Sequence, residues 1–301
     1  MHERALVRDL EQLLEEGGLR GSFLVRDLDT GEELALGRPD LPYPTASLVK
    51  VPLALATAER IHLGELDGAC TVEVVPGRDS TPGPFGLAQF RHPVRVAVED
   101  LLYLAMALSD NTAAELLFES TPPELVADVL RRVGVRGITV RHGIAEVATT
   151  PLGALDPADA HLALELAIGA PTEGHGHPVC QLDVTHASSG SARAYVELLQ
   201  EVWRPTAVAA PVAARVRGLM GANMLRQRLT PDFASDSAVW SSKTGTVLNC
   251  RHEVGVVEHT DGQVLAVAAL TESLVPAVVQ PGAEALMGRV ARGLHDHLRA
   301  R

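Results

Sequence analysis

A serine stands three residues before a lysine at the start of an apolar, alanine-rich stretch, residues 44–62. Residues three apart on a helix share one face, so the amine of Lys50 can lie against the hydroxyl of Ser47. A serine hydroxyl becomes a nucleophile when a base takes its proton, and burial or a nearby positive charge fits lysine for that task by lowering its pKa. The spacing therefore favours a nucleophile at Ser47 and its base at Lys50, while a helix start with a solvated lysine remains the plain alternative.

Lysine occurs at only two positions, Lys50 and Lys243, and the rest of the 26 lysine and arginine residues are arginine. An arginine stays charged at every physiological pH, whereas a lysine amine can titrate near neutrality when it is buried. This usage suggests that both lysines serve where a titratable amine is needed.

A Ser-Asp-Asn run at 109–111 separates an apolar helix pattern at 101–108 from a second helix pattern. All three residue types are preferred helix caps, so a cap is the plain interpretation. In the functional interpretation the Ser109 hydroxyl carries a proton and the Asn111 amide binds the substrate.

A Lys-Thr-Gly-Thr run begins at Lys243, after a strand pattern at 238–242, and would form the sheet edge that faces the helices. Lysine at a strand edge is also an ordinary guard against aggregation. In the functional interpretation Lys243 lowers the pKa of its neighbours and attracts an anionic substrate, while Gly245 lets the backbone approach the acyl group. The backbone N–H groups of Ser47 and Thr246 could then form an oxyanion hole.

Hydrophobic periodicity predicts the elements that position these residues. Helix patterns cover 6–14, 48–61, 98–107, 112–118, 123–133, 157–168, 191–202 and about 276–298. Strand patterns cover 22–27, 33–36, 238–241, 253–258 and 264–270, and no strand pattern of comparable strength lies within 47–199.

This order predicts an α+β protein in which terminal helices cover an antiparallel sheet and an all-helical part is inserted between the strands. The expected sheet domain comprises residues 1–45 and 203–301, and the expected helical domain comprises residues 46–202. Ser47 would lie on the seam between them, a common place for a ligand cleft.

Composition restricts the partners. The chain has 301 residues, 46% of them hydrophobic, and a formal net charge of −12, which argues against nucleic acid or an anionic membrane surface as the main partner. Three widely spaced cysteines, Cys70, Cys180 and Cys250, indicate a reducing compartment, not a disulfide framework. The first residues lack the apolar core of a signal peptide, so we expect a cytoplasmic protein unless a signal once preceded them. No cofactor is indicated, and the oligomeric state is open.

Ser-x-x-Lys at 47, Ser-Asp-Asn at 109 and Lys-Thr-Gly at 243, in this order, are the motifs of class A β-lactamases and penicillin-binding proteins. With residues 28–34 and 109–117, they make the chain resemble the class A β-lactamase branch of the penicillin-recognising serine hydrolases over most of its length. The resemblance implies a β-lactamase/transpeptidase-like fold. It also implies an acyl-enzyme on Ser47, with Lys50 as acylation base or relay and Ser109 as the hydroxyl that passes a proton to the leaving nitrogen.

The resemblance also implies how a small-molecule substrate is held. Lys243 and Thr244 would bind its carboxylate. Arg251 follows at nearly the spacing of a carboxylate-binding arginine, and a solvated strand arginine is the equal alternative.

The chain departs from the family in the Ω-loop, where class A enzymes carry Glu-x-x-x-Asn and the glutamate activates the deacylating water. By its distance from Asn111 the best candidate is Glu146, with Thr150 in the place of the asparagine, and a solvated loop carboxylate is the alternative. The Ω-like loop, about 140–182, is extended by an insertion at 151–182 that contains a helix. We interpret the insertion as a lid or specificity element.

The insertion contains His175, His177 and Cys180, which are residue types that bind zinc. Their spacing fits no standard zinc site, so no metal is expected.

The leading hypothesis is a serine hydrolase that opens a β-lactam or related cyclic amide through an acyl-enzyme, with water attack assisted by Glu146. The alternative keeps the acyl-enzyme in a cytoplasmic acyltransferase, esterase or peptidase, or in a penicillin-binding-protein-like enzyme with slow deacylation. A catalytically silent binding protein is disfavoured because every acylation residue is present.

Overall fold

The protein is built around a five-stranded antiparallel sheet, in a computed structural model that describes residues 3–151, 156–172 and 176–301. The strand order is β2-β1-β10-β9-β8. The strands are β1 (Leu19–Asp27), β2 (Glu33–Leu36), β8 (Ala238–Val247), β9 (Cys250–His259) and β10 (Val264–Ser273). Because β1 pairs with β10, the two ends of the chain meet in one sheet.

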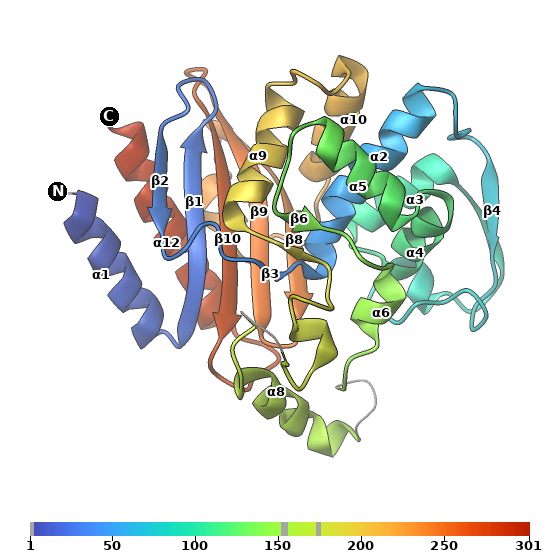
Figure 1. The fold of residues 1–301 in the computed structure, drawn as a ribbon, viewed down its shortest axis with the longest axis horizontal. Helices are drawn as coiled ribbons and strands as arrows, with labels where there is room; N and C mark the ends of the chain where they lie inside the picture. Colours follow the sequence, from blue (N-terminus) through green and yellow to red (C-terminus); the bar gives the residue numbers. More distant parts are fainter. Residues whose placement is uncertain (1–2, 152–155, 173–175) are drawn as a thin grey trace.

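The two faces of the sheet are covered by different helices. The terminal helices α1 (Glu3–Glu16) and α12 (Pro281–Arg299) lie on one face, and α9 (Ala192–Trp203) lies on the other (Figure 1). Side chains alternate along a strand, so Phe23 enters the core under the terminal helices while its neighbour Leu24 enters the core under the helical part. The α+β arrangement predicted from periodicity is confirmed.

The helical part is organised around α2 (Lys50–His62), whose residues from Lys50 to Glu59 are all buried. A helix that is buried on every side is a core helix and must be apolar nearly throughout. The helices packed around it are α3 (Val98–Ala107), α4 (Asn111–Ser120), α5 (Pro123–Arg132) and α10 (Ala210–Gly221). Lys50 is a buried residue with an ionisable side chain at the start of this helix.

Periodicity did not indicate α10, which follows residue 203 and packs on α2 and α9 as well as on β8. The division into a sheet domain of 1–45 and 203–301 and a helical domain of 46–202 therefore stays a prediction.

Short strands also lie within 47–199, where no comparable pattern was found. They are β6 (Ile138–Thr139) and β7 (Ser189–Gly190), which form a small sheet with β3 (Tyr43–Pro44) just before that range, and β4 (Thr71–Val74), which pairs with β5 (Val94–Ala97). A strand of two residues cannot show alternation, so the sequence carried no signal for the first three. The small sheet fixes residues 43–44 just before the nucleophile.

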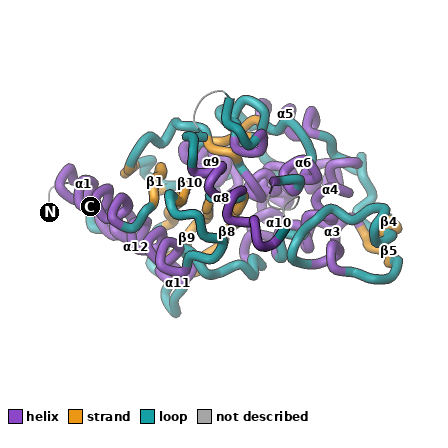
Figure 2. The backbone as a smooth tube through the Cα atoms, turned by 90° about the horizontal axis from the view of Figure 1, so that it is seen from below, coloured by secondary structure: helices purple, strands orange, loops and turns teal. Residues whose placement is uncertain are grey.

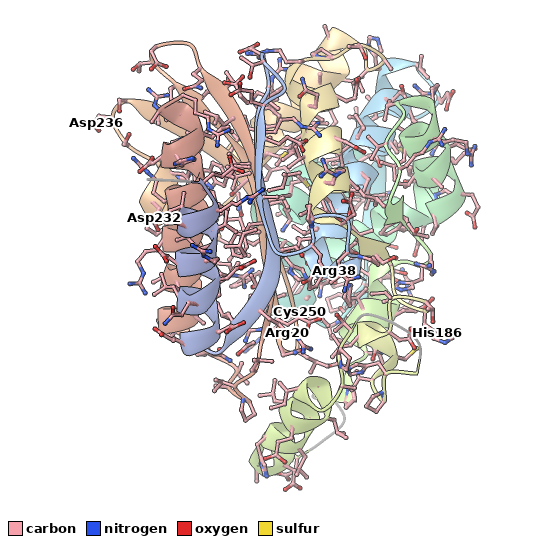
Figure 3. All side chains as sticks on the ribbon, turned by 60° about the vertical axis from the view of Figure 1, so that its left-hand side comes forward. Arg20, Arg38, His186, Asp232, Asp236 and Cys250 are labelled. Carbon is pink, nitrogen blue, oxygen red and sulfur yellow. The ribbon has the colours of Figure 1, made fainter. Side chains whose placement is uncertain are left out.

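The insertion folds under one end of the sheet. It contains α8 (Ala160–Ile168), which follows α6 (Ile144–Ala148) and lies beneath the ends of β8 and β9 (Figure 1; seen from below in Figure 2). Its Leu164 packs in a small core with Leu248 and Cys250, and Cys250 is visible above α8 in Figure 3. The helix predicted at 157–168 is thus present as a 3-10 turn at 157–159 followed by α8, while 152–155 and 173–175 lie outside the described residues.

None of the described helices is long and apolar enough to cross a membrane. The three cysteines are free thiols. Within the described ranges no group of three or more histidine, cysteine, aspartate or glutamate side chains is arranged to hold a metal ion. The ring of His177 contacts the main chain at Val179 and Ala167, and His175 lies outside the described residues.

Candidate active site

Ser47 lies in a 3-10 turn, Ala46–Val49, that leads directly into α2. Ala46 has φ 47°, a region that is sparsely populated by residues other than glycine, and there the chain turns from β3 into the helix. Lys50 Nζ lies 3.2 Å from Ser47 Oγ, and the Lys50 side chain is buried. The structure thus brings the two residues together as the one-turn spacing predicts.

The amine of Lys50 also reaches the loop between α3 and α4. Its Nζ lies 2.6 Å from the main-chain oxygen of Ser109, 3.2 Å from Ser109 Oγ and 2.8 Å from Asn111 Oδ1. Ser109 has φ 58°, an unusual conformation that turns both its carbonyl and its hydroxyl toward the amine. Lys50 therefore joins Ser47 to Ser109.

The three residues of the Ser-Asp-Asn run make different contacts. Asp110 is the helix cap, since its carboxylate accepts hydrogen bonds from Ala113 N at 3.2 Å and Leu87 N at 2.6 Å. Ser109 and Asn111 instead face Lys50. The capping interpretation is confirmed for Asp110, while the proton-carrying and substrate-binding roles of Ser109 and Asn111 stay predictions.

Lys243, from the edge strand β8, completes the network. Its Nζ lies 3.0 Å from Ser109 Oγ and 2.9 Å from the main-chain oxygen of Thr244. A hydroxyl oxygen accepts two hydrogen bonds and donates one. With both lysine amines donating to it, the Ser109 hydroxyl keeps its own proton for a third group.

Burial determines the electrostatics of both amines. Burial, followed by the charge of Lys243, lowers the pKa of Lys50 well below its ordinary value. Burial, followed by the charge of Arg228, lowers the pKa of Lys243 to about 7, and the carboxylate of Glu253 opposes that change. A lysine whose pKa is depressed can act as a base near neutral pH.

Strand β8 approaches the nucleophile closely because Gly245 has no side chain. A Cβ there would lie 2.9 Å from Thr45 O and 3.0 Å from the Leu48 side chain. The glycine therefore lets the strand approach the turn that carries Ser47. Beside it, the buried Thr244 Oγ1 finds no hydrogen-bond partner among the described residues.

Arg228 is a site residue that sequence reasoning missed. Its buried guanidinium donates to Thr246 Oγ1 at 2.6 Å and to Gly245 O at 2.8 Å, and pairs with Glu284 at 3.0 Å. It lies in an irregular segment before α11 (Thr230–Phe233), where neither periodicity nor a motif marks it. It holds positive charge behind the strand that carries Lys243.

Glu253 was also missed, because it lies in a strand that otherwise reads as apolar. Its carboxylate accepts from Leu229 N at 2.8 Å, Trp240 Nε1 at 3.0 Å and Ser242 Oγ at 2.7 Å. Burial raises its pKa, and these donors oppose that change. The Glu253 carboxyl group is buried near two basic side chains, Lys243 of β8 and Arg228.

Arg251 is buried, unlike a solvated strand arginine. Its guanidinium donates to main-chain oxygens of Leu248 at 2.5 Å, Cys250 at 3.1 Å, Ala277 at 3.2 Å and Val278 at 2.9 Å. The side chain lines the cavity beside the nucleophile. These hydrogen bonds link the turn between β8 and β9 to the loop at residues 277–278.

Glu146 is exposed on α6 and is not among the residues that line the cavity beside Ser47, although Val147, Ala148 and Thr150 are. The structure therefore does not bring its carboxylate to the nucleophile.

Two adjoining cavities open at Ser47. The smaller, about 140 Å³, is lined by Ser47, Ser109, Asn111 and Thr244 among others. The larger, about 370 Å³, extends from Ser47 toward α6 and α8, and its described lining contains no aspartate, glutamate or histidine. The smaller cavity thus brings together residues of the three motifs, while the walls of the larger one are mainly apolar.

Two solved structures share this fold. A β-lactamase from Sphaerobacter thermophilus aligns with a TM-score of 0.78 at 20% identity, covering 99% of this chain and 98% of that one. PBP-A aligns with a TM-score of 0.75 at 15% identity, covering 99% and 97%. At these identities the likeness shows the fold alone.

Comparison of the sequence with known families and proteins shows the family. Residues 5–298 match the model of the Beta-lactamase enzyme family, and the chain belongs to that family. It is 61% identical over 310 residues to the beta-lactamase regulatory protein BlaB of Streptomyces cacaoi, covering 99% of each chain.

Proposed function

We propose that this protein is a serine enzyme that is acylated on Ser47 by a β-lactam or related cyclic amide carrying a carboxylate, and that loses the acyl group slowly. The observation that carries the proposal is the position of the Lys50 amine, 3.2 Å from Ser47 Oγ and 3.2 Å from Ser109 Oγ. The same Ser109 oxygen lies 3.0 Å from Lys243 Nζ. One base thus reaches both the nucleophile and the hydroxyl that serves the leaving group.

In the proposed acylation, the neutral amine of Lys50 accepts the Ser47 proton as Oγ attacks the substrate carbonyl carbon. The backbone N–H groups of Ser47 and Thr246 stabilise the oxygen that becomes negatively charged. Collapse of the tetrahedral intermediate breaks the C–N bond, and Ser109 donates its proton to the leaving nitrogen. Ser109 regains a proton from the Lys50 ammonium, which returns the amine to its neutral form.

The substrate carboxylate would bind at the other end of the smaller cavity. Thr244 lines this cavity, and its hydroxyl has no partner among the described residues. The amine of Lys243 is buried next to it, 2.9 Å from the main-chain oxygen of Thr244. Arg228 adds positive charge from behind the strand. This arrangement supports a small anionic substrate.

Deacylation requires a base that activates water next to the acyl carbonyl. The described lining of the larger cavity offers no carboxylate or imidazole, and Glu146 is exposed on α6 and absent from that lining. We therefore place this protein nearer to an enzyme with a persistent acyl-enzyme than to a rapid hydrolase.

A second candidate function is regulatory. The relative from Streptomyces cacaoi bears the name beta-lactamase regulatory protein. A long-lived acyl group would favour whichever conformation accommodates it, so slow deacylation suits a sensor of β-lactams.

The test is an intact-mass time course after mixing the protein with a chromogenic cephalosporin or a fluorescent penicillin. We expect a long-lived adduct on Ser47 with little release of product, and no adduct on the Ser47→Ala variant. Rapid turnover would contradict slow deacylation, and the absence of an adduct with either compound would refute acylation by β-lactams.

A further inference from the structure

We propose that His252 is a positioning residue for the nucleophile: its ring holds the carbonyl of Pro44 and thereby fixes the turn that carries Ser47 against the Lys50 amine. The effect on acylation rests on the proposed function, whereas the hydrogen bond between His252 and Pro44 does not. The histidine acts through the main chain just before Ser47 and not on the substrate.

His252 lies in β9, directly opposite Gly245 of β8. Opposite residues in an antiparallel pair have their side chains on the same face of the sheet. This is the face that contacts the nucleophile turn, because a Cβ at Gly245 would meet Thr45 O and Leu48. The chain crosses this face from β2 through β3 to α2 (Figure 1). The pair thus presents one residue without a side chain and one imidazole ring to the segment before Ser47.

Both ring nitrogens of His252 form hydrogen bonds, and the main chain determines which of them carries the proton. Nδ1 lies 3.1 Å from the backbone nitrogen of Thr271, which can only donate, so Nδ1 accepts and carries no proton. The proton of the neutral ring is therefore on Nε2, which donates to Pro44 O at 2.9 Å. A backbone N–H and a backbone carbonyl thus hold the ring in one tautomer and one orientation.

The surroundings of His252 keep the ring neutral and its main chain in place. The side chain is buried, and burial lowers the pKa of the ring to about 3. Arg228 Nη1 donates to the carbonyl of His252 at 2.7 Å and to that of Gly245 at 2.8 Å, so one guanidinium fixes both members of the pair. The donor to Pro44 is therefore a well-held part of the sheet that does not titrate near neutral pH.

The segment that His252 holds is strained at the residue before the nucleophile. Ala46 has φ 47°, a conformation that persists in residues other than glycine only when the surrounding structure holds it. Pairing of β3 with β7 supplies one restraint, and the hydrogen bond from His252 supplies another. Without the second restraint we expect the turn to relax and Ser47 Oγ to move away from Lys50 Nζ, from which it now lies 3.2 Å.

Two amide variants separate the two nitrogens of the ring. The glutamine amide nitrogen reaches the position of Nε2, so His252→Gln keeps a donor to Pro44 O. The asparagine oxygen reaches only the position of Nδ1, so His252→Asn keeps an acceptor for Thr271 N and loses the donor to Pro44. Val256→Ala, at a buried position on the same strand, controls for loss of stability.

Stopped-flow acylation by a fluorescent penicillin gives the binding constant and the acylation rate constant separately. We expect the acylation rate constant of His252→Asn to fall about 10²-fold with the binding constant unchanged, because a misplacement of about 1 Å can have that effect. His252→Gln and Val256→Ala should stay within about threefold of the wild type. Equal rate constants for His252→Asn and His252→Gln, or an equal fall in Val256→Ala, would overturn the proposal.

A measurement on the wild-type protein covers the case in which His252→Asn fails to fold. Long-range ¹⁵N–¹H spectra of histidine-labelled protein should show a ring with a protonated Nε2 and an unprotonated Nδ1, unchanged between about pH 5 and 8. The absence of its signals from His252→Gln assigns them to His252. A protonated Nδ1, or titration of this ring within that range, would also overturn the proposal.

The positioning role and the proposed function fail separately. A β-lactam adduct that forms equally fast in His252→Asn and His252→Gln would refute the positioning role alone. If penicillin leaves the wild type unmodified, labelling of Ser47 by a fluorophosphonate reports the reactivity of its hydroxyl instead. Slower labelling of His252→Asn than of His252→Gln would then support the positioning role, although acylation by β-lactams would be refuted.

Discussion

The two sides of Ser47 differ in chemical character. On one side Lys50, Ser109 and Lys243 form a buried polar network in which every contact is 3.2 Å or shorter. On the other side α6 and α8 present apolar side chains, and the described lining there has no acidic residue or histidine. If Ser47 is acylated as we propose, the groups that would form the acyl-enzyme lie together on one side of it, whereas the described lining on the other side holds no base that could hydrolyse the acyl-enzyme.

The largest expected effect comes from removing the base. Lys50→Met keeps the length of the side chain but cannot accept the Ser47 proton, so the second-order rate of Ser47 acylation should fall about 10³-fold. Stopped-flow measurement with a fluorescent penicillin, alongside a thermal melt that shows intact folding, tests this. Acylation at the wild-type rate would mean that Lys50 is not the base.

The second prediction concerns a variant that places a carboxylate in the larger cavity beside Ser47. The double variant Glu146→Ala/Ala148→Glu moves a carboxylate from the exposed face of α6 to a position that lines the cavity. A base there should speed deacylation about 10²-fold, measured as the decay of the adduct by intact mass.

Glu146→Gln is the matched control for that variant, and its adduct should decay at the wild-type rate. A large slowing in the control would show instead that Glu146 itself drives deacylation, as the sequence led us to expect.

The third prediction concerns pH. Burial lowers the pKa of Lys243 to about 7, so its cationic form, which would bind the carboxylate of the proposed substrate, is lost as the pH rises through that value. The second-order acylation rate should therefore fall about tenfold per pH unit on the alkaline side. Lys243→Arg, whose charge does not titrate, should remove this decline while lowering the rate throughout. A decline that persists in Lys243→Arg would assign it to another group.

The smallest expected effect comes from Glu253. Its carboxylate raises the pKa of Lys243, so Glu253→Gln should move the alkaline decline to lower pH by about one unit or less. The pH–rate profile measures this shift. A profile that keeps its midpoint would show that Glu253 acts only as a hydrogen-bond acceptor for Trp240 and Ser242.

Much of the fold was predictable because the longer elements carry their own periodicity. The helix at 98–107 was predicted at its observed bounds, and the hairpin of β1 and β2 and the strands β9 and β10 were predicted within a few residues. The strands of two residues were missed because they are too short to alternate. Helix α10 was missed because valine, glycine and proline break up its pattern.

Some features of the candidate site could likewise be predicted from the sequence, and others could not. The spacing of Ser47 and Lys50 is a local property, because one helical turn fixes which side chains share a face. The face of α6 that carries Glu146 could not be predicted, since a helix of five residues shows no amphipathic period. Arg228 and Glu253 gave no signal because their roles depend on charges in other segments.

The sequence by itself determined the three motifs, the order of the main elements and the contact within the first motif, because each depends on neighbours along the chain. Tertiary structure alone decided that the Lys50 amine meets Ser109, 59 residues away, and that an inserted helix encloses an apolar cavity beside the nucleophile. Contacts of that kind depend on how buried faces pack against one another, and it is the same burial that lowers the pKa values of the two lysines.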